Sequence, residues 1–145
     1  MLFMIGTWKG YYKYNKEAAQ KAMGFDRTFF TIVIHSFDGK KFEGTVTDDT
    51  ATGGMEGQGI ISGEIDNRNV SFRKFMPKQT YVLKDGSRKV FDSKHPAIYY
   101  SGTVSDNGSM EGHWKIKVQV LLVFGFIPFP FKPQHGTWSM QLSKI

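Results

Sequence analysis

Bulky and polar residues alternate along this chain with a period of two, and turn sequences interrupt the alternation. Trp8, Tyr12 and Tyr14 fall on one face of an extended segment, whereas Lys9 and Lys13 fall on the other. Successive side chains of a β-strand point to opposite faces, so this pattern predicts a half-buried strand. Similar segments are expected to be strands at 27–37, 41–48, 57–65, 70–76, 97–105, 110–118 and 136–142, with a weaker hairpin at 80–90.

The connections between these strands are too short for helical crossovers. Asp38–Gly39 and Asp106–Gly108 are turn sequences of the kind that join antiparallel strands. Parallel strands would need crossovers of a dozen or more residues. A helix of about two turns is expected between Asn15, which can cap its start, and Gly24, which can end it. The sequence therefore predicts an all-β antiparallel meander, a single domain over residues 1–145.

Two internal similarities indicate how the meander closes. The segment Gly44–Asp48 recurs as Gly102–Asp106, and Met-Glu-Gly follows each copy, which suggests the same hairpin twice. Gly6–Trp8 near the start matches Gly136–Trp138 near the end. First and last strands pair in a closed up-and-down barrel, which removes both unpaired edges. We therefore predict a small barrel of about eight to ten strands, with one short helix after the first.

The strand that opens with Gly6-Thr7-Trp8 resembles the Gly-x-Trp start of lipocalins and the opening strands of fatty-acid-binding proteins and avidins. The segment Gly136–Ser139 also resembles avidins, and the short helix is similar in position to the lid of fatty-acid-binding proteins. This calycin-like resemblance implies a barrel that binds a small molecule inside. The lipocalin Thr-Asp-Tyr motif is absent, so the resemblance implies no particular ligand.

Composition sets the charge and the compartment. Nineteen Lys and Arg against thirteen Asp and Glu give a net charge of +6, scattered in short pairs such as Arg73–Lys74. We expect these charges on solvated outer faces, where a positive field favours anionic ligands. The chain has no cysteine, which excludes disulfides and thiolate chemistry and fits a cytoplasmic protein. The start of the chain lacks the pattern of a signal peptide.

No motif predicts catalysis, a metal or a cofactor. The four histidines form no local metal-binding pair, and Gly-x-Ser-x-Gly and phosphate-binding loops are missing. Glu43, Glu64 and Glu111 are expected on outer faces, although acids can also meet inside a barrel. The thirteen Phe, six Tyr and three Trp are better explained as barrel interior than as a stacking surface, so no nucleic acid partner is predicted.

The apolar segment Val118–Phe131 is shorter than the ~20 residues of a transmembrane helix, and Pro128 and Pro130 interrupt it. No transmembrane segment is therefore predicted. We expect its first half to extend the strand that starts at Met110, and Phe124–Phe131 to fold over an apolar surface. That surface would belong to this chain or to a second subunit, which would make the protein a homo-oligomer. A loop that dips into a membrane is the alternative.

The favoured function is a lipocalin-like binding protein for a small, largely apolar ligand, with an anionic group favoured by the net charge. One alternative is a calycin-type isomerase or cyclase that acts on a lipid-like substrate. Another is an oligomeric structural barrel without a ligand. From strand phase alone, the ligand-binding residues are predicted to be Trp8, Tyr12, Phe72, Tyr100, Trp114 and Trp138.

Overall fold

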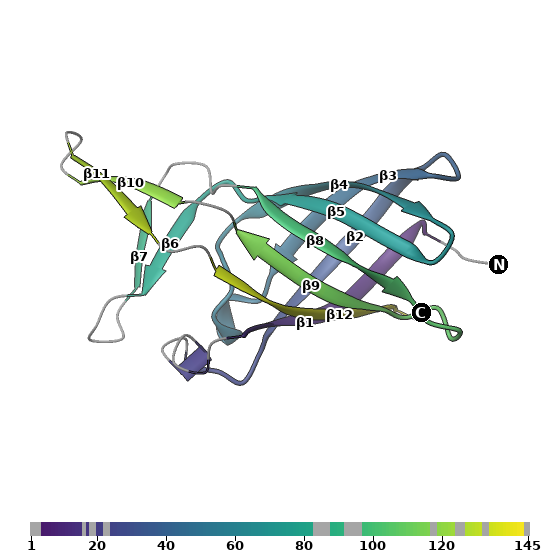
Figure 1. Cartoon of the computed structure of the whole chain (residues 1–145), viewed down its shortest axis with the longest axis horizontal. Helices are drawn as coiled ribbons and strands as arrows, with labels where there is room; N and C mark the ends of the chain where they lie inside the picture. The colour runs from purple at the N-terminus through teal and green to yellow at the C-terminus, as the bar shows by residue number, and fades with distance from the viewer. Residues whose placement is uncertain are drawn as a thin grey trace.

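The computed structural model describes residues 4–15, 17, 20–21, 24–82, 88–91, 97–116, 119–123, 127–131 and 134–143. Eight of its strands form a closed antiparallel barrel in the order β1-β12-β9-β8-β5-β4-β3-β2 (Figure 1). These are β1 (Gly6–Tyr14), β2 (Thr28–Phe37), β3 (Lys41–Asp48), β4 (Gln58–Asp66), β5 (Asn69–Phe75), β8 (Ile98–Val104), β9 (Met110–Ile116) and β12 (Gln134–Leu142). The up-and-down meander predicted from the sequence is confirmed.

The barrel closes between its first and last strands, as the two Gly-Thr-Trp segments predict. Tyr12 of β1 lies opposite Trp138 of β12, and Tyr14 lies opposite Gly136. At Gly136 a Cβ atom would collide with the Lys13 carbonyl oxygen and with the Trp114 ring. Glycine at this position therefore lets the Trp114 indole donate a hydrogen bond of 3.0 Å to the Lys13 oxygen across the closure.

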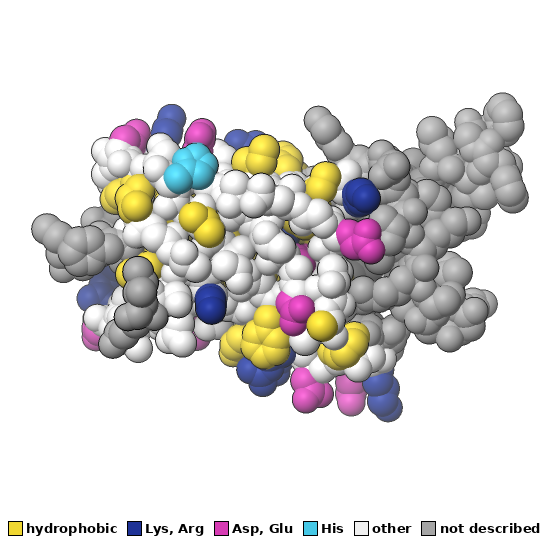
Figure 2. Space-filling view, turned by 180° about the vertical axis from the view of Figure 1, so that it is seen from behind, with side chains coloured by type: hydrophobic (Ala, Val, Ile, Leu, Met, Phe, Trp, Pro, Cys, Tyr) yellow, Lys and Arg dark blue, Asp and Glu magenta, His cyan; other side chains and the backbone are white. Residues whose placement is uncertain are grey.

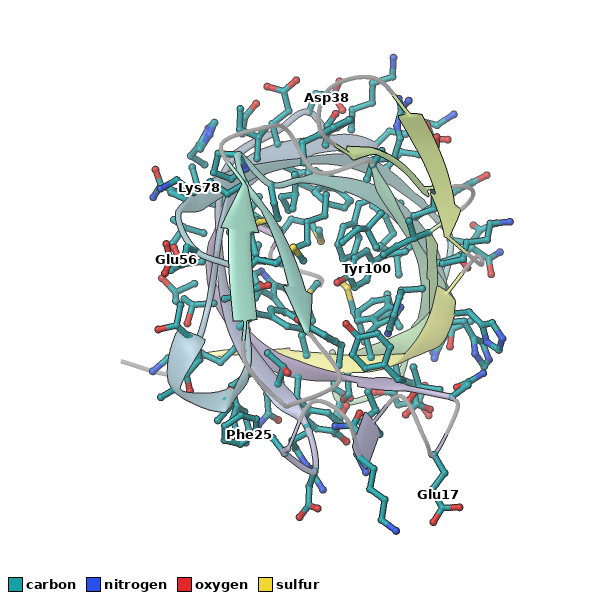
Figure 3. All side chains as sticks on the ribbon, turned by 90° about the vertical axis from the view of Figure 1, so that its left-hand side faces the viewer. Glu17, Phe25, Asp38, Glu56, Lys78 and Tyr100 are labelled. Atoms are coloured by element: carbon teal, nitrogen blue, oxygen red, sulfur yellow. The ribbon has the colours of Figure 1, made fainter. Side chains whose placement is uncertain are left out.

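The interior holds one cluster of buried hydrophobic side chains supplied by all eight strands and by Met4 and Met76 outside them. Each large side chain moved out of water contributes roughly 1.5–3 kcal/mol, so this cluster is the main stabilising feature of the fold. In a view along the barrel axis, Tyr100 lies within the ring of strands (Figure 3). The other labelled side chains point away from the ring: Glu17, Phe25, Asp38, Glu56 and Lys78.

The two ends of the barrel differ. At the terminal end, which carries both chain termini in Figure 1, the carbonyl oxygen of buried Met4 accepts a hydrogen bond of 2.9 Å from the Trp8 indole. At the hairpin end, two separate two-stranded sheets project from the barrel. These pair β6 (Gln79–Val82) with β7 (Arg88–Phe91), and β10 (Gln119–Val123) with β11 (Ile127–Phe131).

The apolar segment 118–131 corrects one expectation. β9 ends at Ile116, and Gln119–Val123 pairs with Ile127–Phe131 rather than continuing β9 in the barrel sheet. Both strands of a two-stranded sheet are edges, which is where proline is tolerated, and Pro128 lies opposite Leu122. Phe124 and Phe126 lie outside the described residues. The expected burial of this segment and the homo-oligomer contact through it therefore stay predictions.

The helices also differ in part from the expectation. Between Asn15 and Gly24, helical conformation is described at Glu17, Gln20 and Lys21, and the positions between them lie outside the described residues. The helical element whose bounds are described is the 3-10 turn η1 (Thr50–Thr52), which follows β3 rather than β1. None of the helices described is long and apolar enough to cross a membrane.

Candidate functional site

Two charged side chains lie inside the barrel near its hairpin end. Asp48 is the last residue of β3 and Lys74 lies near the end of β5, and both follow the inward phase of their strands. Their side chains are 0% and 1% exposed, and the Lys74 ammonium lies 2.6 Å from Oδ1 of Asp48. This is a fully buried ion pair in an otherwise hydrophobic interior. Such pairs carry a large desolvation cost, so their surroundings determine what they do.

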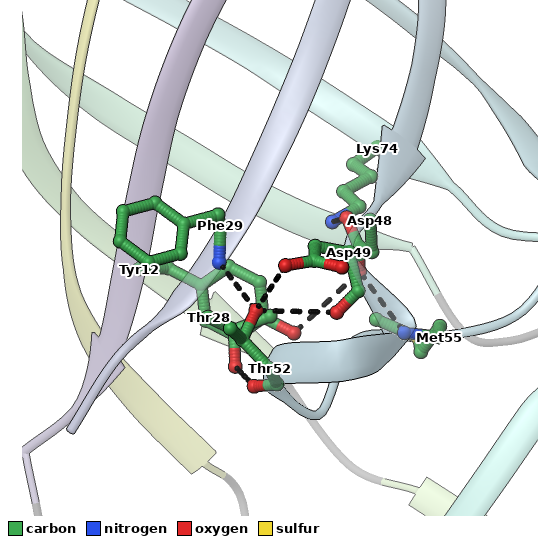
Figure 4. Close-up of polar contacts among 8 residues, drawn as sticks. All are labelled: Tyr12, Thr28, Phe29, Asp48, Asp49, Thr52, Met55 and Lys74. Atoms are coloured by element: carbon green, nitrogen blue, oxygen red, sulfur yellow. Dashed lines mark hydrogen bonds and ion pairs between the residues drawn. The ribbon is translucent and has the colours of Figure 1, made fainter. Parts of the chain in front are cut away.

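The loop after β3 holds the Asp48 carboxylate in place. The second oxygen, Oδ2, accepts a hydrogen bond of 3.3 Å from the Met55 backbone and lies 3.5 Å from the Tyr12 hydroxyl. Thr28 closes the loop against β2 by donating a hydrogen bond of 2.8 Å to the Thr52 carbonyl oxygen (Figure 4). Gly54 packs against the Asp48 side chain, where a Cβ atom would collide with it. Both carboxylate oxygens therefore already have donors.

Lys74 makes fewer hydrogen bonds than its ammonium group can donate. Its Nζ lies 5.1 Å from the centroid of the Tyr12 ring and 5.9 Å from that of Phe30, so two aromatic faces stabilise the charge. An ammonium has three N–H donors. Among the described residues, Asp48 is the one hydrogen-bond acceptor that Lys74 contacts. The other two N–H donors therefore have no acceptor among the described residues, and the Tyr12 and Phe30 rings lie beside the ammonium.

Two buried tyrosine hydroxyls lie within electrostatic reach of the ion pair. Burial raises the pKa of Tyr12 well above the ordinary value of 10.0, and the charge of Asp48 raises it further. Burial raises the pKa of Tyr100 well above 10.0 in the same way, followed by Asp48 and then Tyr14. Both phenols therefore stay protonated at neutral pH and can donate a hydrogen bond. The Tyr100 hydroxyl makes no hydrogen bond with any described residue.

Aromatic rings surround this polar group. Trp114 meets Tyr12 and Tyr14 edge to face, with centroids 5.9 Å and 5.1 Å apart. Tyr100 stacks on Phe72 at 4.6 Å and meets Trp138 at 5.7 Å. Tyr14 and Met55 are partly buried hydrophobic residues that pack against the core at this end. We call Tyr12, Asp48, Lys74 and Tyr100 the polar cluster.

All six residues predicted for the interior are buried, with exposed fractions of 5% or less. Tyr12 and Tyr100 belong to the polar cluster, and Trp114 packs on Tyr12. Phe72 and Trp138 pack against Tyr100. Trp8 is not part of this group, because it lies four residues before Tyr12 along β1, about 13 Å away. Its indole bonds the Met4 carbonyl oxygen instead.

The sequence prediction missed Asp48 and Lys74. Charged residues were expected on outer faces, and this is wrong for both, although the neighbouring Arg73 is exposed as expected. The signal was present in the strand phase. Val70 and Phe72 point inward, so residue 74 must do so too, and Val46 places residue 48 in the same way.

The other candidate ionisable groups lie outside the barrel. Glu43, Glu64 and Glu111 are exposed, as expected. Three of the histidines, His35, His113 and His135, are also exposed, and His95 lies outside the described residues. Over the part of the chain that the structure describes, no three His, Asp or Glu side chains gather as a metal site would require.

The outer wall has hollows of its own, one of which lies over β1, β2, β3 and β12. Another hollow lies over β4, β5, β8 and β9 and reaches β3 and β12, and its lining includes the basic residues Lys41, Arg73, His113, Lys115 and His135. Figure 2 shows one face of the molecule, on which hydrophobic side chains occur in separate spots rather than in one continuous patch. Scattered exposed hydrophobic residues are normal on a soluble protein and indicate no docking site.

Comparisons with known proteins assign this chain to no family, so the function is inferred from the site. No protein-family model, no curated protein and no solved structure matches this chain. The closed eight-stranded barrel is compatible with the calycin-like fold that the sequence resembles.

Proposed function

We propose that this barrel binds a small, largely apolar molecule whose polar end lies at the polar cluster. The observation that carries the proposal is the buried ion pair between Asp48 and Lys74 within an apolar, aromatic interior. Replacing a buried ion pair by hydrophobic residues is often neutral or stabilising, so stability is a poor explanation for it. A few convergent polar groups in an apolar environment are what small-molecule sites use to orient a ligand.

The hairpin end is the proposed entrance. The polar cluster lies nearer to this end, because Asp48 is the last residue of β3 and Lys74 lies near the end of β5. The proposed ligand contacts are Tyr12, Tyr100 and Trp114, with Phe72 and Trp138 supporting Tyr100 from behind. Trp8 is then a structural residue of the opposite end. This revises the sequence-based set, in which all six residues contact the ligand.

The proposal extends the calycin-like resemblance, which the closed up-and-down topology supports at the level of fold. The lipocalin-like assignment, the cytoplasmic location and the lack of a nucleic acid partner are part of the proposal. They rest on the Gly-x-Trp opening, the missing cysteines and the burial of the aromatic residues in the interior.

Thermal shift and tryptophan fluorescence test the proposal with a panel of fatty acids, fatty alcohols, retinoids and haem. At 100 times its Kd, a ligand of the native state stabilises it by about 2.7 kcal/mol. We expect at least one compound to raise the Tm of the wild type. The same compound should raise the Tm of the control Arg73→Met, which removes an exposed cation next to Lys74 in the sequence. The double variant Asp48→Leu/Lys74→Met, which avoids an unpaired buried charge, should lose the response. If the double variant binds as the wild type does, the site lies elsewhere.

A second candidate function is catalysis, and the same cluster favours it. Asp48 offers a carboxylate and Tyr12 a protonated phenol 3.5 Å apart, the two partners that general acid–base chemistry needs. An isomerase or cyclase of a lipid-like compound would use them to move a proton. A bound panel compound that is recovered unchanged after hours with the protein contradicts this candidate. Turnover that is lost in Asp48→Asn, with binding retained, would favour it.

A further inference from the structure

The charges inside the barrel balance. Lys74 is buried, and so is Asp48, its partner at 2.6 Å. Every other charged side chain whose burial the structure describes is at least partly exposed. Over the described residues, the interior that a ligand would meet is therefore neutral, because the two charges of its ion pair cancel. A carboxylate that entered would be a third, unpaired charge beside Asp48, and low-dielectric surroundings make such repulsion strong.

The hydrogen-bonding groups do not balance. Both oxygens of Asp48 already face donors: Lys74 at Oδ1, and the Met55 backbone and Tyr12 at Oδ2. Tyr100 is 4% exposed, and its hydroxyl has no acceptor among the described residues. The Lys74 ammonium also has N–H donors without an acceptor among the described residues, and the Tyr12 and Phe30 rings lie beside it. The cluster therefore has N–H and O–H donors without a partner, whereas each Asp48 oxygen already has at least one donor, and a buried donor without a partner is costly.

We propose that the ligand is an uncharged molecule with an apolar body and a carbonyl oxygen, which accepts a hydrogen bond from the Tyr100 hydroxyl. This inference rests on the proposed binding function and makes its ligand class specific. It replaces the anionic ligand that the net charge favours. A carbonyl oxygen accepts but does not donate, so it supplies the group that the cluster lacks without adding a charge. An amine would add a donor and a positive charge and is disfavoured on both counts.

A ligand series with one chain length tests the charge argument. The probes are 2-undecanone, undecane, undecanoic acid and undecylamine, with Kd measured by tryptophan fluorescence at pH 7.5. We expect the ketone to bind tightest, about tenfold tighter than the hydrocarbon, as one net hydrogen bond of ordinary strength provides. The acid should bind more weakly than the ketone at pH 7.5 and more tightly as the pH falls below its own pKa. Tighter binding of the ionised acid than of the ketone would overturn the inference.

A matched pair of tyrosine variants tests the hydroxyl. Tyr100→Phe removes the inward hydroxyl, whereas Tyr99→Phe removes that of the next residue, which lies on the outer face of β8. We expect Tyr100→Phe to lose the roughly tenfold preference for ketone over hydrocarbon, with hydrocarbon affinity unchanged. Tyr99→Phe should keep the wild-type preference. An unchanged preference in Tyr100→Phe would overturn the assignment of that hydroxyl.

Infrared spectroscopy supplies a measurement that does not depend on affinity. The C=O stretch of carbonyl-13C 2-undecanone should move to lower frequency on binding to the wild type, and this shift should disappear in Tyr100→Phe. A bound ketone with an unshifted stretch contradicts the hydrogen bond. If no member of the series and no compound of the wider panel binds, the proposed function itself is wrong. That outcome is distinct from binding with a different preference.

Discussion

Each end of the barrel has an ion pair with an N···O distance of 2.6 Å, and the two pairs differ in almost everything else. Lys74 and Asp48 at the hairpin end are 1% and 0% exposed. Arg68 and Asp106 at the terminal end join the β4–β5 and β8–β9 turns and are 67% and 92% exposed. Water screens the outer pair, whereas the inner pair is isolated from it. Burial rather than distance therefore decides which pair matters for stability and for chemistry.

The largest effect is expected when one partner of the inner ion pair is removed and the other is left in place. Lys74→Met should lower the free energy of unfolding by about 3–5 kcal/mol, because it leaves the Asp48 carboxylate buried and uncompensated. The double variant Asp48→Leu/Lys74→Met should recover most of that loss, because no unpaired charge remains. Urea denaturation of the two variants measures the difference. A single variant as stable as the wild type would mean that Asp48 reaches solvent or takes up a proton at little cost.

A second prediction concerns the terminal end. Met4 is 1% exposed, so Met4→Ala should cost about 2–3 kcal/mol through the cavity that it leaves. Ligand affinity should not change, because Met4 lies at the opposite end from the polar cluster. Denaturation and a binding titration with the same variant separate the two quantities. If Met4→Ala alters affinity as much as stability, the ligand extends through the whole barrel.

A third prediction follows from the raised pKa values of Tyr12 and Tyr100. The folded state holds these protons to a higher pH than the unfolded state, in which tyrosine titrates near 10. The stability they contribute is therefore complete below pH 10 and is lost as the pH rises from there toward their folded pKa values. Unfolding curves from pH 8 to 11 should show this loss, and it should be smaller in Tyr12→Phe/Tyr100→Phe. Equal slopes in the two proteins would show that other groups cause it.

The sequence was sufficient for the barrel because the barrel depends on local signals. Period-two alternation marks each barrel strand, and the Gly-Thr-Trp segments at Gly6 and Gly136 mark the closure. All six predicted interior residues are buried for the same reason. Lys74 and Asp48 were predicted to be exposed because they are charged. The alternation along β5 and β3 places both side chains on the inward face instead.

Other parts of the site depend on long-range register. Asp48 lies on β3 and Lys74 on β5, and β4 separates the two strands. Their contact can be predicted only when the registers of β3 with β4 and of β4 with β5 are known. The contact of Met55 with Asp48 depends on the conformation of a loop, which alternation does not specify. The β10–β11 hairpin was missed because apolar residues on both strands leave no period-two alternation by which its strands and turn can be placed.

The smallest expected effect concerns the outer ion pair and is the control for the largest. Arg68→Met should change the free energy of unfolding by less than about 1 kcal/mol, because exposed pairs gain little over their hydrated ions. Arg68 also donates to the Val104 carbonyl oxygen, but at 3.5 Å this hydrogen bond is long and exposed.

The difference in unfolding free energy between Arg68→Met and the wild type should shrink further at 1 M salt, where the Debye length is about 3 Å. The Lys74→Met effect should persist at that salt concentration, because ions do not reach the interior. If both effects fall together with salt, the inner pair is more accessible to water than its burial indicates, and the neutral, enclosed character of the polar cluster would have to be abandoned.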